Sequence, residues 1–263
     1  MILVDDHCHL MHKAYTDIDK VIDNAKKAGV KAIICSGINP PTNREALEIA
    51  KKYPMARASL GIYPVDALGI EQDVEGGLTT HKGPIDLDKE FEFIKQNKEK
   101  IAAVGEVGLD YHWVKDLELQ KKERENFARI IEFVEKLKKP IIVHTRKAEQ
   151  DCIDMLTSSK LKNVILHCFE GRKSLIKKAA DAGFIFSVPT SIARSQHFQV
   201  LVEMVSINQL TTETDGPYLS PDGSFPNMPE NVKVVIDKIA QIKKFEPEEV
   251  ANNVWLNFQR IYG

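Results

Sequence analysis

Short apolar segments alternate with segments of helical periodicity from one end of the chain to the other. In 123–138, for example, Phe127, Ile130, Val134 and Leu137 recur at three- and four-residue steps, which predicts a helix with one apolar face. Similar periodicity predicts helices at 17–28, 41–52, 172–182 and 195–205. The apolar segments, typical of buried strands, are 2–6, 31–36, 56–61, 102–108, 140–145, 163–168, 184–188 and 210–214.

This alternation predicts an α/β fold. Strands that are apolar on both faces belong in a parallel sheet covered by helices, and their regular order with helices indicates right-handed βαβ units. Eight such strands within 263 residues favour a closed (β/α)8 TIM-type barrel, formed by residues 1–263 as one domain. The alternative, an open doubly wound sheet, would normally carry a glycine-rich loop after its first strand, where this chain has DDHCHL.

One connection is unusually long. Segment 68–86 (LGIEQDVEGGLTTHKGPID) is polar, contains several glycines and follows the third predicted strand. Long loops in compact domains are commonly functional or mobile. Two interpretations stay open: a lid over the barrel mouth, or a plain surface insertion.

The net charge, the first residues and the cysteines limit the classes of function that the chain could have. The formal net charge is −2, so the chain lacks the basic excess of proteins that grip nucleic acid along a broad face, and a phosphate substrate would have to be held locally. The first residues, MILVDDHCHL, are not typical of a signal peptide, and no stretch resembles a membrane span, which predicts a cytoplasmic protein. The four cysteines form no CxxC pair and are expected to be reduced packing residues.

Polar residues with metal-binding side chains occur where predicted strands end. His7 and His9 follow the first strand, and residues two apart in an extended chain point to the same side, so both can reach one ion. Barrel active sites gather at this end of the strands. Further candidates follow the fourth, fifth, sixth and eighth strands: Glu106, His144, His167 and Asp215.

The number of candidate ligands indicates two metal ions. Six donors exceed what one catalytic zinc normally takes, and Glu106 is the natural bridge because a carboxylate can bind both ions. Nitrogen and carboxylate donors suit several divalent metals, and Mg²⁺, Mn²⁺ and Zn²⁺ all stay open. The alternative for each residue taken singly is a buried polar group with a protein partner or a helix cap.

Six segments resemble, in the same order, the motifs of TatD-type deoxyribonucleases and related hydrolases of the amidohydrolase superfamily. They are DDHCHL, GEVGLDYH, PIIVHTR, LHCFEG, ETDGPYL and the terminal WLNFQRIY, and they extend over essentially the whole chain. The resemblance implies that the six candidates occupy the family's metal positions. It also implies DNA or another phosphodiester as substrate.

Two departures from the family pattern concern the substrate. Where the family usually has Gly-x-His-Pro-His, this chain has Tyr63 and Val65 at the histidine positions. Near 224–231 the family often has Arg-Asn-Glu-Pro, and here the chain reads Phe-Pro-Asn-Met-Pro over 225–229. Phosphate handling or leaving-group assistance is therefore expected to differ from that in the family.

Catalytic roles follow from this chemistry. Metal-activated water would attack the phosphorus, with Glu106 bridging the ions and Asp215 as general base. Arg146 could bind a phosphate oxygen, and Tyr111 and Trp113 could stack a base. The alternative role for Arg146 is a surface ion pair, and the alternative role for Tyr111 and Trp113 is packing of the loops. Tyr63 is a further candidate substrate contact. Weaker candidates are Lys147, Arg172 and Arg194. Three other histidines are expected to be surface or loop residues: His12, His81 and His197.

Three functions remain open. The first is a divalent-metal-dependent deoxyribonuclease, exonuclease-like, with no membrane and no obligate protein partner. The second keeps the metal centre but acts on a small lactone, amide or phosphoester, as the altered residues at 63 and 65 and the missing basic excess would suit. The third is a non-catalytic binding module, which a full set of metal donors disfavours.

Overall fold

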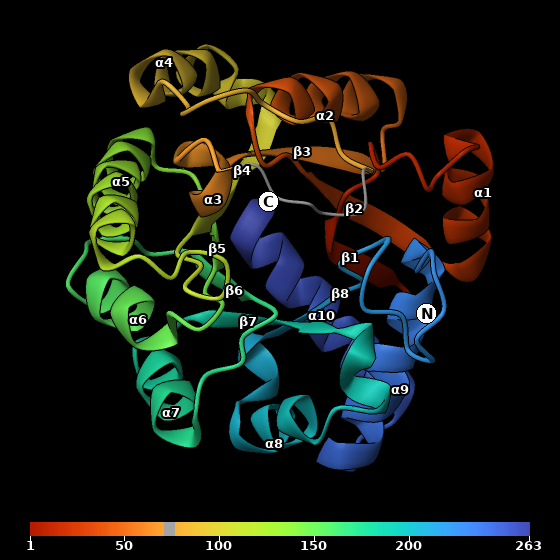
Figure 1. The fold of residues 1–263 in the computed structure, drawn as a ribbon. Coiled ribbons are helices and arrows are strands. Elements are labelled where there is room, and N and C mark those ends of the chain that lie inside the picture. The colour runs from red at the N-terminus through yellow and green to blue at the C-terminus, as the bar shows by residue number, and fades with distance from the viewer. Residues whose placement is uncertain (71–76) are drawn as a thin grey trace.

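The strands close into a barrel. The computed structural model describes residues 1–70 and 77–263, and within them eight strands form one parallel sheet in sequential order (Figure 1). Each predicted apolar segment contains or overlaps one strand. The strands are β1 Leu3–Cys8, β2 Val30–Ser36, β3 Ala56–Ile62, β4 Ile101–Gly108, β5 Ile141–His144, β6 Val164–His167, β7 Ile185–Pro189 and β8 Leu210–Glu213.

The last strand returns to the side of the first. Cys8 and Gly216 form a parallel bridge, and the backbone N–H of His9 donates to the carbonyl oxygen of Gly216 at 2.8 Å. The backbone N–H of Asp215 donates to the carbonyl oxygen of His7 at 2.9 Å. These contacts confirm the (β/α)8 TIM-type barrel, and they place the residues after β1 and β8 side by side.

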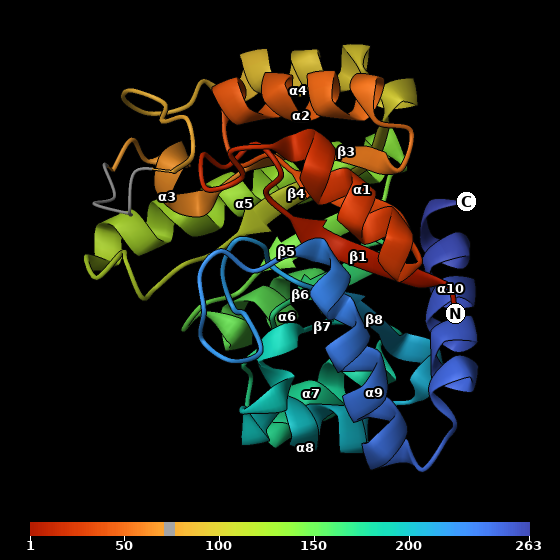
Figure 2. The same ribbon diagram turned by 90° about the vertical axis from the view of Figure 1, so that its right-hand side faces the viewer.

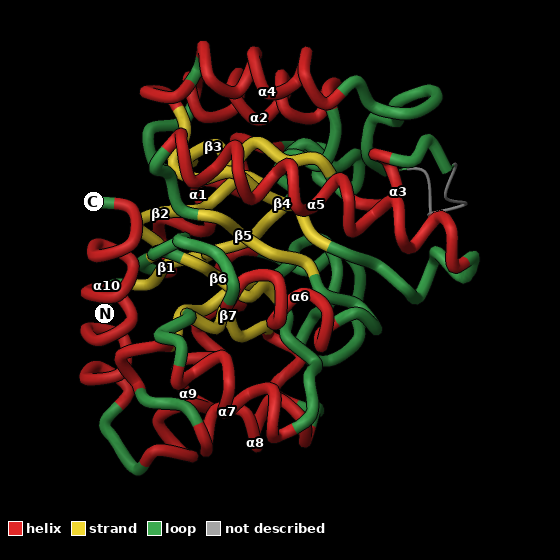
Figure 3. Tube along the Cα trace, turned by 90° about the vertical axis from the view of Figure 1, so that its left-hand side faces the viewer, coloured by secondary structure: helices red, strands yellow, loops and turns green. Residues whose placement is uncertain are grey.

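Helices surround the strands (Figure 3). The five predicted helices are present, although α5 begins at Leu117 rather than near 123, because Asp116 caps it by accepting from the backbone N–H groups of Glu118 and Leu119. The helices are α1 Ile18–Ala28, α2 Pro40–Lys52, α3 Pro64–Ala67, α4 Leu87–Gln96, α5 Leu117–Leu137, α6 Glu149–Thr157, α7 Lys173–Asp181, α8 Gln196–Met204, α9 Val232–Lys243 and α10 Pro247–Tyr262.

The two ends of the barrel differ. Helix α10 lies across the end where the strands begin (Figure 2). The side chain of its Asn257 donates to the carbonyl oxygen of Leu210 at the start of β8. At the opposite end, where the strands finish, the barrel is bordered by α3 and the loops. No helix in the described ranges is long and apolar enough to cross a membrane.

The cysteines behave as packing residues, as predicted. All four are free thiols, and Cys8, Cys35 and Cys152 are buried while Cys168 is half-buried. Burial raises the pKa of the Cys35 thiol to about 12, so it stays protonated at neutral pH.

Candidate metal centre

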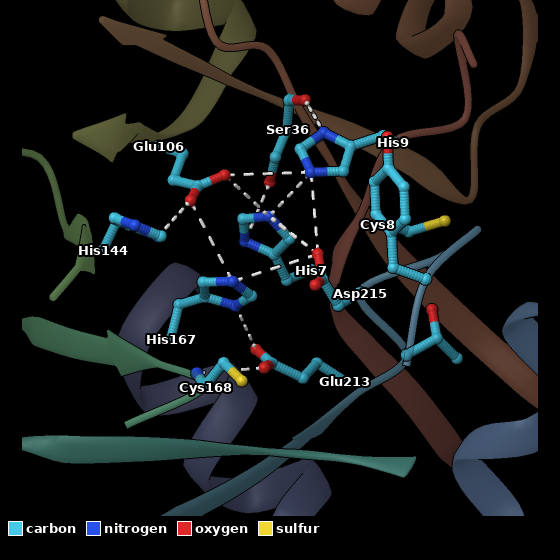
Figure 4. A network of polar contacts seen from close by, with 12 residues as sticks. His7, Cys8, His9, Ser36, Glu106, His144, His167, Cys168, Glu213 and Asp215 are labelled. Carbon is cyan, nitrogen blue, oxygen red and sulfur yellow. Dashed lines mark hydrogen bonds and ion pairs between the residues drawn. The ribbon is translucent and has the colours of Figure 1, made fainter. Parts of the chain in front are cut away.

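The six predicted ligands converge at the carboxyl ends of the strands (Figure 4). Four of them end or lie within β1, β4, β5 and β6, one follows β1, and one follows β8. Their ligand atoms form overlapping groups in which the atoms of each group lie within 4.8 Å of one another. The groups are His7, His9 and Glu106; Glu106, His144 and His167; and His7, His167 and Asp215.

Glu106 stands between two pairs of histidines. Its Oε2 lies 3.3 Å from Nε2 of His7 and 3.7 Å from Nε2 of His9. Its Oε1 lies 2.8 Å from Nδ1 of His144 and 4.0 Å from Nε2 of His167. One carboxylate oxygen thus faces each pair, which is the arrangement expected of a carboxylate shared by two ions.

Asp215 faces the same centre from the loop after β8. Its Oδ1 lies 3.6 Å from Nε2 of His9, 3.8 Å from Nε2 of His7 and 3.9 Å from Nε2 of His167. Burial raises the pKa of this carboxyl, but the positive charge of His167 and the hydrogen bond from His9 outweigh burial and leave the pKa below its ordinary value. Asp215 is therefore ionised at neutral pH.

The donor set fits a divalent cation. The Nδ1 of His9 lies 2.8 Å from the carbonyl oxygen of Ser36, which only accepts, so Nδ1 carries the hydrogen and a neutral ring has its lone pair on Nε2. The Nδ1 of His167 lies 2.9 Å from Oε2 of Glu213 and is protonated for the same reason. The Nε2 atoms of His7 and His9 lie only 3.3 Å apart. A divalent metal ion can bind the lone pairs of these histidines together with the carboxylates that face the same point.

Without metal, the histidines have very different pKa values. Burial and the charge of His167 lower the pKa of His7 to about 4. For His167, burial lowers the pKa, but the charges of Glu213 and Asp215 outweigh it and raise the pKa to about 10. For His144, hydrogen bonds to Asp110 and Glu106 outweigh burial and raise the pKa to about 9. Metal must therefore displace protons from His144 and His167.

Residues behind the ligands were not predicted from the sequence. Glu213 is completely buried and holds His167, and Ser36 faces His9 through its carbonyl oxygen and His7 through its hydroxyl, 3.3 Å from Nδ1 of His7. Glu213 could have been recognised from the sequence, since it is an acid near the end of the predicted strand at 210–214. Ser36 could not have been recognised in this way, because its shorter contact is made by its backbone carbonyl, a group that every residue has.

The centre lies at the bottom of a cavity of about 830 Å³. Trp113, Arg146 and Arg194 line its rim, and residue Trp113 is 45% exposed, so it is available to a ligand. The guanidinium of Arg146 lies 5.8 Å from the Trp113 ring centroid. The arginine salt bridges in the described part of the chain involve Arg44, Arg124 and Arg129 instead.

The long connection contributes to this cavity. Residues 71–76 of the candidate lid lie outside the described residues, but Ile70 and the stretch 77–82 line the cavity. Backbone contacts tie part of this segment down, since the N–H of Lys13 donates to the carbonyl oxygen of Gly77. The described part of the segment therefore belongs to the mouth rather than to a distant surface.

The structure gives the loop after β4 a different arrangement from the one expected. Asp110 is completely buried, and its carboxylate accepts from the backbone N–H of His112 and lies 2.8 Å from Nε2 of His144. The hydroxyl of Tyr111 donates to Asp151 at 2.6 Å and accepts from Arg124 at 2.9 Å, away from the residues that line the cavity. Trp113 remains at the rim.

The two positions that depart from the family pattern also differ from each other. Tyr63 lines the cavity, and its hydroxyl donates to Oδ2 of Asp110 at 2.7 Å. Val65 is completely buried in α3 and does not line the cavity. In the other departing segment, Asn227 is buried and its side-chain amide donates to the carbonyl oxygens of Thr214 and Tyr218, so it braces the loop after β8.

The remaining candidates do not lie together. His12 lies in a loop, as expected, but it is buried rather than on the surface, where Tyr218 and Phe225 pack against its ring. His81 lines the cavity, and His197 contacts the carbonyl oxygen of Phe169. Lys147 and Arg172 line a separate, smaller hollow, where Arg172 donates to Gln150.

Comparisons with known proteins agree with this geometry. Residues 4–263 match the family described as TatD related DNase. An uncharacterized metal-dependent hydrolase of Methanocaldococcus jannaschii, MJ1582, is 37% identical, and the match covers 97% of this chain and 94% of that protein. The human deoxyribonuclease TATDN3 is 32% identical, with 99% of this chain and 94% of that protein covered.

A solved structure shows the same fold. The Escherichia coli TatD homolog YJJV superposes with a TM-score of 0.84 at 22% identity, over 99% of this chain and 97% of that one. With the match over residues 4–263 and the barrel that carries the donors at its strand ends, the chain belongs to the TatD-related DNase family of metal-dependent hydrolases.

Proposed function

We propose that this protein is a deoxyribonuclease that hydrolyses phosphodiester bonds in an exonuclease-like manner at a centre of two divalent metal ions. The observation that carries the proposal is the position of Glu106, with a pair of histidines facing each of its carboxylate oxygens. Family membership and the name of the human relative support DNA as the substrate.

The residues of the chain divide the chemistry between them. When bound, divalent ions supply Lewis-acid chemistry that acidifies water and offsets the charge of the phosphate. Glu106 would hold both ions, with His7 and His9 on one side and His144 and His167 on the other. Asp215 is ionised at neutral pH and faces the centre, so it serves as the general base that takes the proton of the attacking water.

Residues at the rim would hold the substrate. Arg146 would donate to a phosphate oxygen, and the exposed ring of Trp113 would stack a base. Tyr63 lines the same cavity and could contact the substrate with its ring, since its hydroxyl is engaged with Asp110. Tyr111 is left with packing against α5 and α6 as its principal role, because its hydroxyl is bonded to Arg124 and Asp151.

A second candidate function keeps the centre and changes the substrate to a small lactone, amide or phosphoester. The observation that favours it is the altered substrate side of the cavity, where Tyr63 replaces a family histidine and Val65 is buried away from the cavity. The net charge of −2 agrees with it, because no broad basic face is required for a small ligand.

One experiment separates the two candidates. End-labelled single-stranded DNA is incubated with the protein and Mg²⁺, Mn²⁺ or Zn²⁺, with a chelator and the Glu106→Ala variant as controls. We expect metal-dependent release of nucleotides that the chelator and the variant abolish. No release with any of the three metals would reject the nuclease, and a panel of lactones, amides and small phosphoesters would then be assayed under the same conditions.

A further inference from the structure

One of the four histidines is turned the other way from the rest. His7, His9 and His167 direct Nε2 toward the carboxylates of the centre. His144 directs Nδ1 toward Glu106, at 2.8 Å from Oε1, and its Nε2 points outward. A histidine ring that turns by half a revolution about its Cβ–Cγ bond exchanges each nitrogen with a carbon, so something must select this orientation.

Asp110 provides an acceptor for the outward nitrogen. Its Oδ2 lies 2.8 Å from Nε2 of His144, so Nε2 carries the hydrogen and Nδ1 is left with a lone pair facing the centre. After a half-turn of the ring, carbon atoms would face both Asp110 and Glu106, and both contacts would be lost. The carboxylate of Asp110 therefore favours one ring orientation over the other.

Asp110 is itself held in place from three directions. Its Oδ1 accepts from the backbone N–H groups of His112 at 2.9 Å and Trp113 at 3.0 Å. Its own backbone N–H donates to Oε2 of Glu123, from helix α5, at 3.4 Å. Because Asp110 is completely buried, no water replaces these partners, and the carboxylate has a single position.

Tyr63, which follows β3, completes the arrangement. Its hydroxyl donates to the same Oδ2 at 2.7 Å, and its ring packs edge-on against His144 with 4.9 Å between ring centroids. The hydroxyl thus occupies the lone pair of Oδ2 that His144 leaves, and the ring limits the space in which the imidazole can turn. Tyr63 stands where the resemblance predicts a histidine, so this bond is a property of this chain's own sequence.

We propose that Asp110 and Tyr63 are positioning residues that fix His144 as an Nδ1 ligand, and that they act selectively on the ion held by His144 and His167. The selectivity follows from the geometry, because neither residue contacts His7 or His9, whose outer nitrogens face Ser36. This inference rests on the proposed two-metal centre, but it makes no use of the substrate.

The test is a titration of the metal-free protein with Co²⁺, followed by the visible absorption of the bound ion, without any substrate. Wild type is expected to bind two ions. In Asp110→Ala one of the two is expected to bind about 10- to 100-fold more weakly, with an altered spectrum, while the other stays within about twofold. Asp110→Asn, whose amide oxygen can still accept from Nε2–H, is expected to show a smaller loss, and Tyr63→Phe a loss of a few-fold.

A matched control removes a similar bond elsewhere. Tyr53→Phe deletes a tyrosine hydroxyl that donates to a carboxylate oxygen of Asp19 at 2.8 Å, outside the barrel, and should leave both Co²⁺ affinities unchanged. Thermal unfolding of each metal-free variant shows whether it is folded. If Asp110→Ala does not fold, Asp110→Asn and Tyr63→Phe carry the test.

The possible failures are distinguishable. Unchanged affinities and spectra in folded Asp110 and Tyr63 variants would overturn the inference, and equal weakening of both ions would overturn its selectivity. A wild-type protein that binds only one ion would instead overturn the two-metal proposal. None of these outcomes depends on whether DNA is cleaved.

Discussion

The metal centre and the rim of the cavity are built in different ways, although they adjoin. The ligands lie at strand ends, and each histidine has a protein partner at its outer nitrogen. The rim residues Trp113, Arg146 and Arg194 come from loops and are exposed. The difference indicates that the barrel determines the chemistry, whereas the loops determine which substrate reaches it.

Replacing Glu106, the proposed bridge between the two metal ions, should have the largest effect on activity. Glu106→Ala is expected to lower turnover by on the order of a thousandfold or more and to reduce the metal content, because both histidine pairs lose their shared carboxylate. Steady-state kinetics and elemental analysis measure the two effects. Exposed Glu132→Ala on α5 is the control, and near-normal turnover with full metal content in Glu106→Ala would refute the bridging role.

Asp215→Asn separates ligation from proton transfer. The amide keeps an oxygen that can bind metal but is a much poorer base, so we expect turnover to fall about 10²- to 10⁴-fold while much of the metal is retained. Parallel measurement of kcat and metal content checks this. A kcat close to wild type at full occupancy would assign the base to another group.

Changes at the rim should affect substrate binding rather than chemistry. Arg146→Ala and Trp113→Ala are each expected to raise KM about tenfold and to leave kcat within about twofold, since neither residue touches the metal ligands. Arg172→Ala is the matched arginine control, because its guanidinium donates to Gln150 outside this cavity. A large fall in kcat in a rim variant would remove the distinction between rim and centre.

The smallest effect concerns stability rather than catalysis. Burial, together with the negative charge of Asp110, raises the pKa of Glu123 from 4.5 to about 8. The folded protein therefore binds this proton more tightly than the unfolded chain, so ionising Glu123 destabilises the fold progressively between pH 4.5 and pH 8.

The variant Glu123→Gln mimics the protonated form. We expect it to match wild type below pH 4.5 and to become more stable by roughly 1 to 3 kcal/mol by pH 8. Urea unfolding at several pH values measures the difference. A difference that does not change with pH would show that Glu123 has an ordinary pKa in the folded protein.

The sequence predicted the barrel and all six converging residues, because both depend on periodicity and on the position of strand ends. His7 and His9 are an example, since an extended chain leaves them little choice but to share a face. Which ring nitrogen of His144 faces inward could not be predicted, because it depends on Asp110, from another strand-end loop, and on Tyr63 beyond β3. The burial of Asp110 was not predicted either, because two of its side-chain partners, His144 and Tyr63, are distant in the sequence.

The contact between the strands β1 and β8 ties the assembly of the metal centre to the closure of the barrel. His7 and His9 belong to the first strand and its loop, whereas Asp215 follows the eighth strand. The backbone N–H of Asp215 meets the carbonyl oxygen of His7 only when β8 lies beside β1. The full set of candidate donors therefore exists only in a closed barrel, so metal binding by all of them would report that the ring of strands has formed.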